Sequence, residues 1–362
     1  MGKKDKVAVI YGGKSGEHEI SLRSAASVVH NLDASLYDII PIAIDKNGLL
    51  FLNDYQEMMT YRDSLPVKTE HSKALPSLDN FGKLTIDADV IFPVMHGPLY
   101  EDGCLQGLLE SLSIAYVGCG VLSSAIGMDK DMTRKVACRH DIRHAPYVCL
   151  TATQSDAQRQ TILQQLIDRN QWPLFVKPCS LGSSVGTHKV NDSQSLHEAV
   201  KDAFRFDHTV LVEDCIHGQE IEISVLEDLE IGNPPRASTP GEIKTVHQDG
   251  FYSYNAKYCQ SELTDLIIPA NISKDLQQKV QHAAIQIFQR LKCQGLARID
   301  FFIAGNDIYF NEINTMPGFT SISMYPKLWQ HDNLGYEDLL NQLVTLAKRN
   351  HQIKSNRLTD YQ

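Results

Sequence analysis

The order of apolar segments near the start of the chain constrains its fold most strongly. The stretch KVAVIYGG (6–13) reads as a buried strand that ends in glycines, and YDIIPIAI (37–44) reads as a second buried strand. Between them, residues 19–31 repeat apolar side chains at helical spacing. A strand, a glycine turn, a helix and another strand in this order predict a parallel α/β sheet. A third strand over 89–97 and a helix over 101–113 continue the same pattern.

The length of the chain indicates more than one domain, because 362 residues exceed what one hydrophobic core usually organises. We expect an N-terminal α/β domain over residues 1–122, in which the polar stretch 53–85 is an irregular surface insertion. A helical segment at 123–140 opens a central domain over 123–216, which holds three predicted strands and two helices. The C-terminal domain, residues 217–362, contains a long helix, a pair of strands and a closing amphipathic helix.

Composition excludes several kinds of partner. The formal charge of −10 repels polyanions, so we expect no nucleic-acid partner. No apolar run is long enough to cross a bilayer, and the first residues lack the pattern of an export signal. The eight cysteines form no CxxC pair, which favours free thiols. We therefore expect a cytoplasmic protein that acts on small molecules, without a membrane partner.

Two strands near the end of the chain bring oxygen-bearing side chains together. LARIDFFIA and DIYFNEIN are separated by a short turn signal, so they predict a hairpin. If the loop has three residues, 305–307, then Asp300 lies directly opposite Glu312, whereas a two-residue loop would put these side chains on opposite faces. Glu312 and Asn314 share a face because strand side chains alternate.

This grouping of Asp300, Glu312 and Asn314 predicts a divalent metal site. Hard cations such as magnesium prefer oxygen ligands and commonly share them with nucleotide phosphates. The alternative is a solvated polar face on a sheet. The residues around the three are apolar, which favours the metal site.

The stretch LFVKPCSLGSSVGT (174–187) predicts a phosphate-binding loop. An apolar strand delivers Lys177, and a run of Gly and Ser that exposes backbone N–H groups follows. The spacing is not that of a Walker loop. A loop of Gly and Ser is otherwise just a flexible turn.

Three other stretches admit both an ordinary and a functional interpretation. Lys130, between two aspartates on a helical segment, reads by itself as a surface lysine. The crossover at 210–222 is either an ordinary connection or a place where backbone groups bind a base and a carboxylate binds a ribose. The aromatic stretch 249–258 is either a loop packed by its own tyrosines or a lid whose Lys257 reaches phosphate and whose Tyr258 touches substrate.

The N-terminal stretch YGGKSGEHEIS places two glycines and a serine before a helix. It lacks the GxGxxG spacing, so we discount a nicotinamide dinucleotide site. Glu17 has a plain explanation, since carboxylates are favourable near a helix start. His96 follows the third strand at its carboxyl end, where open α/β sheets place their ligands.

Seven stretches together resemble the D-alanine–D-alanine ligase family, which has the ATP-grasp fold. They occur in the family's order, from residue 11 to about residue 325. The stretches are YGGKSGEHEIS, VMHGPLYEDGCLQG, GMDKDMTRK, VKPCSLGSSVG, YNAKY, ARIDFF and NEINTMPGFTSIS. The resemblance implies an N-terminal parallel α/β domain followed by two α+β domains that sandwich ATP, with a lid near 249–260. It also implies joining of two D-alanine molecules through an acyl phosphate, for peptidoglycan precursors.

The resemblance further implies which residues bind ATP and metal. The groups expected to hold the phosphates are Lys130, Lys177 and Lys257. Those expected to contact the adenosine are Glu213, Ile216 and Phe251, with Glu220 on the ribose. Asp300, Glu312 and Asn314 would hold two magnesium or manganese ions.

For the amino-acid substrates, the resemblance implies that Glu17 holds the ammonium of the first D-alanine. Arg298 and the backbone N–H of Gly318 would form an oxyanion hole, and Ser183 and Tyr258 would join Glu17 in a hydrogen-bonded set. The second-substrate pocket would be lined by His96, Ser323 and Met324. The family also implies a homodimer.

Other classes of function make different predictions. A non-catalytic nucleotide-binding protein on the same scaffold would have lost a part such as Arg298 or a metal ligand, and all are present. A ligase for a different amino acid would differ at Glu17, Ser183 or Tyr258, a trio that suits a small D-amino acid.

Overall fold

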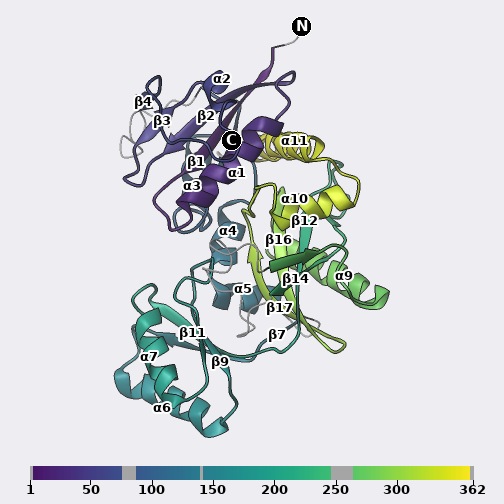
Figure 1. The fold of residues 1–362 in the computed structure, drawn as a ribbon. Helices are drawn as coiled ribbons and strands as arrows, with labels where there is room; N and C mark the ends of the chain where they lie inside the picture. Colours follow the sequence, from purple (N-terminus) through teal and green to yellow (C-terminus); the bar gives the residue numbers. More distant parts are fainter. Residues whose placement is uncertain (1–2, 76–86, 139–141, 246–263, 359–362) are drawn as a thin grey trace.

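The computed structural model describes residues 3–75, 87–138, 142–245 and 264–358, which form three sheets. In Figure 1 the sheet of the N-terminal residues lies at the top, the sheet of the C-terminal residues in the middle and the sheet of the central residues at the bottom. We refer to them as the N-terminal, central and C-terminal sheets. Among the described helices, none combines the length and the apolar character that a bilayer crossing requires. The mixed α/β architecture agrees with the fold class expected from the sequence.

The N-terminal sheet has the strand order β4-β3-β2-β1-β5-β6. Its strands are β1 (Asp5–Gly12), β2 (Tyr37–Ile44), β3 (Leu50–Leu52), β4 (Lys73–Leu75), β5 (Val90–Val94) and β6 (Ala115–Tyr116). The strand β1 runs parallel to β2 and β5, as the sequence predicts. The helices that follow β1 and β5 are α1 (His18–Asn31) and α3 (Cys104–Ser111). Because β1 and β5 are parallel, the residues after both strands meet at one edge of the sheet.

The expected insertion at 53–85 is more regular than predicted. Within its described part, α2 (Tyr55–Met58) is capped by the Asp54 side chain, which accepts a hydrogen bond from the backbone of Glu57. The strand β4 then pairs antiparallel with β3 and extends the sheet. Residues 76–86 lie outside the described residues.

The central sheet is antiparallel, with the strand order β10-β9-β11-β8. Its strands are β8 (Tyr147–Thr151), β9 (Leu174–Pro178), β10 (His188–Val190) and β11 (Thr209–Asp214). The helices α6 (Asp156–Arg169) and α7 (Ser193–Ala203) cover one face, where their apolar side chains share a core with Val176, Val210 and Val212. Strand alternation therefore turns Lys177 and Glu213 to the other face.

The C-terminal sheet has the order β15-β14-β12-β16-β17-β7. Its strands are β7 (Arg143–His144), β12 (Gln219–Leu226), β14 (Gly241–Thr245), β15 (Thr264–Ile267), β16 (Leu296–Ala304) and β17 (Asp307–Asn314), and β13 (Arg236–Ala237) pairs with β12. Ile299, Phe301 and Ile303 share a core with the helix α9 (Lys274–Arg290). The alternate residues Arg298 and Asp300 therefore lie on the opposite face.

The hairpin β16–β17 corrects the predicted loop. Ala304 pairs with Asp307, so the loop has two residues rather than three. A β-bulge between Asp300 and Phe301 then shifts the register by one, and Asn311 is the extra residue on β17. Asp300 still lies opposite Glu312, as predicted, but the bulge and not the loop length is the reason.

The helical segment expected over 123–140 is divided into α4 (Val121–Met128) and α5 (Lys130–Ala137). Asp129 has an extended backbone conformation, and its side chain accepts a hydrogen bond of 2.9 Å from the backbone of Met132. An N-cap of this kind starts a new helix. Both helices contact β17, so they pack on the C-terminal sheet.

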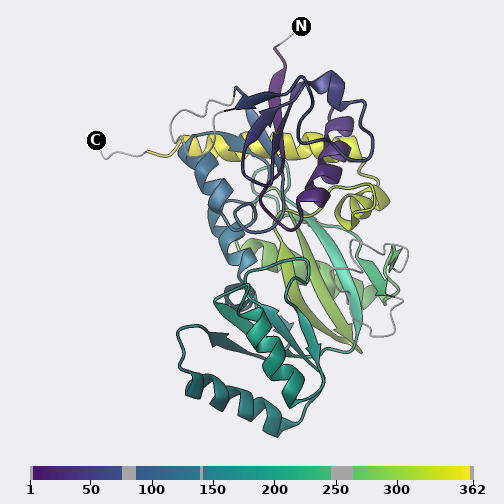
Figure 2. The same cartoon turned by 60° about the vertical axis from the view of Figure 1, so that its left-hand side comes forward.

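The last two helices lead the chain from the C-terminal sheet back to the N-terminal sheet. The helix α10 (Met324–His331) packs beside β12, and α11 (Tyr336–Ser355) contacts β5, β6 and α1. Figure 2 shows α11 lying across the N-terminal sheet, where its leucines share a core with Val7 and Val9. This packing joins the C-terminal part of the chain to the N-terminal sheet. The division of the chain into domains at residues 122 and 216 stays a prediction.

Candidate active site

Asp300, Glu312 and Asn314 meet on the face of β16 and β17 that is turned away from α9. Asp300 is 3 % exposed, and the side-chain nitrogen Nδ2 of Asn314 donates to its Oδ2 over 3.1 Å. Glu312 lies directly across the two strands from Asp300. The three residues predicted from the sequence therefore lie together on one face, and their role as metal ligands stays a prediction. Groups of three or more His, Cys, Asp or Glu residues that could hold a metal are not found in the described ranges.

Arg298 holds the buried carboxylates of this face. Its Nε and Nη2 donate to the two oxygens of Asp300, each over 2.8 Å, and Nε lies 3.2 Å from Oε2 of Glu222. Burial lowers the pKa of Arg298, but the two carboxylates outweigh it and raise the pKa well above its usual value. The guanidinium is therefore a fixed positive charge beside Asp300.

Glu222 is a site residue that the sequence reasoning missed. It pairs with Asp300 across β12 and β16, and it is 5 % exposed. The alternating stretch QEIEI (219–223) could have indicated Glu222, because Glu220 and Glu222 must share one face of a strand. Glu220, expected to contact the ribose, lies on that face, where it is paired in register with Ile243 and Phe302.

Lys130 joins the phosphate-binding loop to the acidic face. It is the first residue of α5, and its Nζ donates to the carbonyl of Leu181 over 2.6 Å. The same Nζ lies 3.5 Å from Oε2 of Glu312. A small cavity of about 30 Å³ is lined by Lys130, Leu181, Gly182, Glu312 and Asn314, among others. Lys130 is therefore not the isolated surface lysine of the plain interpretation.

Lys177 and Glu213 form an ion pair on the face of the central sheet that is turned away from α6 and α7. The Nζ of Lys177 also lies 5.5 Å from the centre of the Phe175 ring. Arg134, which the sequence reasoning missed, contacts the second oxygen of Glu213 over 2.5 Å. Its signal was helical spacing, since Arg134 follows Lys130 by four positions.

Glu17 and Ser183 meet although they lie 166 positions apart in the chain. The Oγ of Ser183 donates to Oε1 of Glu17, while the Glu17 side chain makes no capping hydrogen bond to α1. Glu17 is the N-cap residue of α1, where a carboxylate is favourable, and its side chain contacts Ser183 instead of capping the helix. Ser183 has a positive φ of 53°, a backbone conformation that residues other than glycine rarely adopt. This backbone conformation directs its side chain towards Glu17.

His96 is buried at the same sheet edge as Glu17. A Cβ on Gly97 would lie 3.5 Å from Oε2 of Glu17. The Nδ1 of His96 lies 3.2 Å from the carbonyl of Met316 and 3.9 Å from Oε1 of Glu101, and Nε2 has no hydrogen-bond partner within the described part of the chain. Burial lowers the pKa of His96, but Glu101 reverses this effect and raises it. Glu101 was also missed, although it lies in one of the stretches that carry the resemblance.

The turn after β17 brings Gly318 against Ser323. A Cβ on Gly318 would lie 2.9 Å from the Ser323 Oγ, so a side chain there would force a shift. That Oγ accepts a hydrogen bond of 3.0 Å from the backbone of Thr320. Met324 is buried against Gly241 and Leu328, in a core that it shares with Ile243. Its expected place in a substrate pocket stays a prediction.

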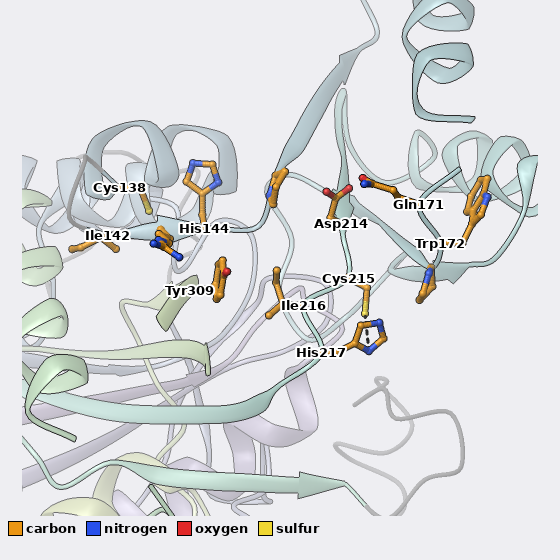
Figure 3. A pocket seen from close by; sticks show the side chains of 13 residues that line it. Cys138, Ile142, His144, Gln171, Trp172, Asp214, Cys215, Ile216, His217 and Tyr309 are labelled. Atoms are coloured by element: carbon orange, nitrogen blue, oxygen red, sulfur yellow. Dashed lines mark hydrogen bonds between the residues drawn. The ribbon is translucent and has the colours of Figure 1, made fainter. Parts of the chain in front are cut away.

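Three expected site residues, Phe251, Lys257 and Tyr258, lie outside the described residues, as does the expected lid at 249–260. Ile216 is described and lines a larger cavity of about 730 Å³. Figure 3 shows that its lining side chains come from the two crossings between the central and C-terminal sheets, residues 142–146 and 214–217. Cys138 after α5, residues 171–173 before β9 and Tyr309 on β17 complete the lining. Lys130, Lys177 and the acidic face do not line it, so the cavity adjoins the expected adenine segment only.

Family models and known relatives match this chain over most of its length. A family model described as "D-ala D-ala ligase N-terminus" matches residues 6–119, and one described as "D-ala D-ala ligase C-terminus" matches residues 136–345. A D-alanine–D-alanine ligase of Legionella pneumophila is 53% identical over 363 residues, covering 100% of both chains.

Solved structures are similar over nearly the whole chain as well. The D-alanine–D-alanine ligase from Coxiella burnetii has a TM-score of 0.81 and 36% identity, covering 98% of this chain and 97% of that one. The ligase from Bacillus anthracis complexed with ATP has a TM-score of 0.71 and 26% identity, covering 97% and 99%.

Proposed function

This chain belongs to the D-alanine–D-alanine ligase family, and we propose that it joins two D-alanine molecules into D-alanyl-D-alanine at the expense of ATP. ATP phosphorylates the carboxylate of the first D-alanine. The amine of the second attacks the acyl phosphate, and phosphate leaves as the amide bond forms. The dipeptide serves the synthesis of peptidoglycan precursors.

The observation that carries this proposal is the position of Lys130. Its ammonium lies between a carbonyl of the Gly/Ser loop and the carboxylate of Glu312. A cation at that point is placed to bind a phosphate that the loop cradles and that the acidic face reaches through a metal ion. We assign Lys130, Lys177 and Lys257 to the ATP phosphates.

Asp300, Glu312 and Asn314 suit two magnesium or manganese ions. Two carboxylates and an amide are too few oxygen ligands for a protein-only site, but they fit ions that take further ligands from phosphates and water. Arg298 and Asn314 occupy only part of the hydrogen-bonding capacity of Asp300, since a carboxylate has about four lone-pair positions. When bound, such ions neutralise phosphate charge.

The remaining residues orient the substrates and stabilise charge. Glu17 holds the ammonium of the first D-alanine, and Ser183 and Tyr258 orient Glu17. Arg298 and the backbone N–H of Gly318 donate to the oxygen on which negative charge develops. His96, Ser323 and Met324 line the pocket of the second D-alanine, and Glu213, Ile216, Phe251 and Glu220 contact the adenosine.

We also propose a homodimer in the cytoplasm, where ATP is available. All seven cysteines of the described residues are free thiols, as expected in a reducing compartment.

A coupled ADP-release assay tests the proposed reaction. We expect ADP formation to require D-alanine, with D-alanyl-D-alanine as the product, and much slower turnover with D-lactate or D-serine as the second substrate. Chromatography of the products identifies the dipeptide. Absence of turnover with D-alanine would contradict the assignment.

Substitution Ser183→Ala tests the contact with Glu17. We expect the KM for D-alanine to rise at least about tenfold, because hydrogen bonds to charged groups contribute about 1.5–3 kcal/mol. The apparent affinity for ATP should change little. Steady-state kinetics with each substrate varied separately measure both values.

Ser111→Ala provides the matched control, since the Ser111 hydroxyl donates to the carbonyl of Gly107 on the exposed side of α3. Equal KM values for D-alanine in wild type and Ser183→Ala would show that Ser183 does not orient Glu17.

A further inference from the structure

Arg134 is a fully buried cation for which the proposed mechanism has no role. It lies on α5 and is 1 % exposed. Its Nη2 contacts Oε2 of Glu213 over 2.5 Å, and its guanidinium lies 4.8 Å from the centre of the Tyr147 ring. Within the described ranges, its Nε and Nη1 have no hydrogen-bond partner. Glu213 is therefore the one carboxylate in the described part of the chain that Arg134 pairs with.

Glu213 is shared between two cations, one on each oxygen. Arg134 contacts Oε2 and Lys177 contacts Oε1. The carboxylate is 4 % exposed, so water offers little solvation to its charge. Two cations for one carboxylate leave this cluster with a surplus positive charge that a further anion can use.

Lys177 has two competing partners, Glu213 and an ATP phosphate. In the structure its ammonium is bound to Glu213, but the proposed function requires it to bind an ATP phosphate. If Lys177 moves to the phosphate, Glu213 loses one of its two cations while it remains buried. A buried carboxylate without any partner is strongly destabilising, because the charge has neither water nor a counter-ion.

We propose that Arg134 is a positioning residue, which neutralises Glu213 and holds its carboxylate in place so that Lys177 is released to bind ATP. The inference rests on the proposed role of Lys177 as a phosphate ligand. Arg134 does not touch ATP itself and acts through Glu213.

The ionisation of Glu213 agrees with this arrangement. Burial by itself raises the pKa of Glu213, but Lys177 and Arg134 outweigh it and lower the pKa to about 2. The carboxylate is therefore charged at any pH at which the enzyme works, and it always requires a cation beside it.

A purely structural role makes a different prediction. In that case the contact between Arg134 and Glu213 only attaches α5 to the central sheet. Its loss would lower the melting temperature and the activity with both substrates, without a selective effect on ATP.

The test uses the full chain with Arg134→Met, which keeps a long side chain but removes the charge. We expect the Kd for ATP, measured by calorimetry without D-alanine, to rise at least about tenfold, as one partner of a buried ion pair is removed. The KM for D-alanine at saturating ATP should stay within about twofold. Arg134→Lys should restore most of the ATP affinity, because it restores the charge.

Arg205→Met provides the control, since Arg205 pairs with Asp202 at the exposed surface, directly after α7. The ATP affinity of this variant should match that of the wild type.

A double variant then shows whether Arg134 acts through Glu213. In a Glu213→Gln background the neutral amide needs no cation, so Arg134→Met should weaken ATP binding by less than about threefold. An equal loss in both backgrounds would overturn the inference, as would unchanged ATP affinity in Arg134→Met alongside weakened binding in Lys177→Met. Unchanged affinity in Lys177→Met would instead overturn the proposed role of Lys177, and the inference with it.

Discussion

Substitution Glu312→Gln is expected to lower kcat by about 10³-fold, the largest effect of any change considered for this protein. The amide has the same shape as the carboxylate, so the hairpin should be retained. It lacks the negative charge that a divalent cation requires, and it also removes the ion pair with Lys130. Initial rates of ADP release over a range of magnesium concentrations measure the effect.

A matched control for this change is Glu198→Gln. Glu198 lies on α7 and accepts a hydrogen bond from Gln194 at the exposed surface. Its substitution should leave the rate unchanged. Near-normal turnover of Glu312→Gln at ordinary magnesium concentrations would show that Glu312 is not a metal ligand.

Substitution Arg298→Ala should lower kcat by about 10²- to 10³-fold, because it removes a charged donor from the developing negative charge. The raised pKa of Arg298 keeps the guanidinium charged throughout the working pH range, so the loss should not depend on pH. The Kd for ATP should change little, since the proposed phosphate ligands remain. Stopped-flow or steady-state rates and calorimetry measure the two quantities.

Removal of the Arg298 guanidinium should also lower the stability of the fold. Arg298 is the partner of Asp300 and Glu222, so its removal leaves two buried carboxylates close together and should destabilise the fold by about 3–5 kcal/mol. Arg298→Lys keeps a charge there and separates the two effects. A folded Arg298→Ala chain with wild-type turnover would refute the catalytic role of Arg298.

The strands β1, β2 and β5 of the N-terminal sheet could be predicted because each is an apolar segment with a glycine or polar boundary, whereas the short strands β3, β4 and β6 were not predicted. The hairpin was predicted with the correct partners but the wrong loop. Phe310 and Ile313 both face the core although three positions separate them, and this spacing indicates a bulge rather than a longer loop. This spacing is visible in the sequence, but it is not used when strand pairs are counted outward from the loop alone.

Local pattern could not show which charged groups of the site pair with one another. Arg134 and Glu213 are 79 positions apart, and Glu17 and Ser183 are 166 apart, so the contacts exist only once the separate sheets are placed together. The break at Asp129 is different, because an aspartate that caps a new helix is a local signal. The substrate was not derivable from residue patterns and came from the resemblance to a family.

Counting the manganese ions bound per chain, by electron paramagnetic resonance in the presence of ATP, tests the central claim most directly. That claim is that Asp300, Glu312 and Asn314 hold the divalent cations that position ATP. We predict two bound ions in the wild type, and fewer in Glu312→Gln and in Asp300→Asn. Equal numbers of bound ions in the wild type and in both variants would contradict the account.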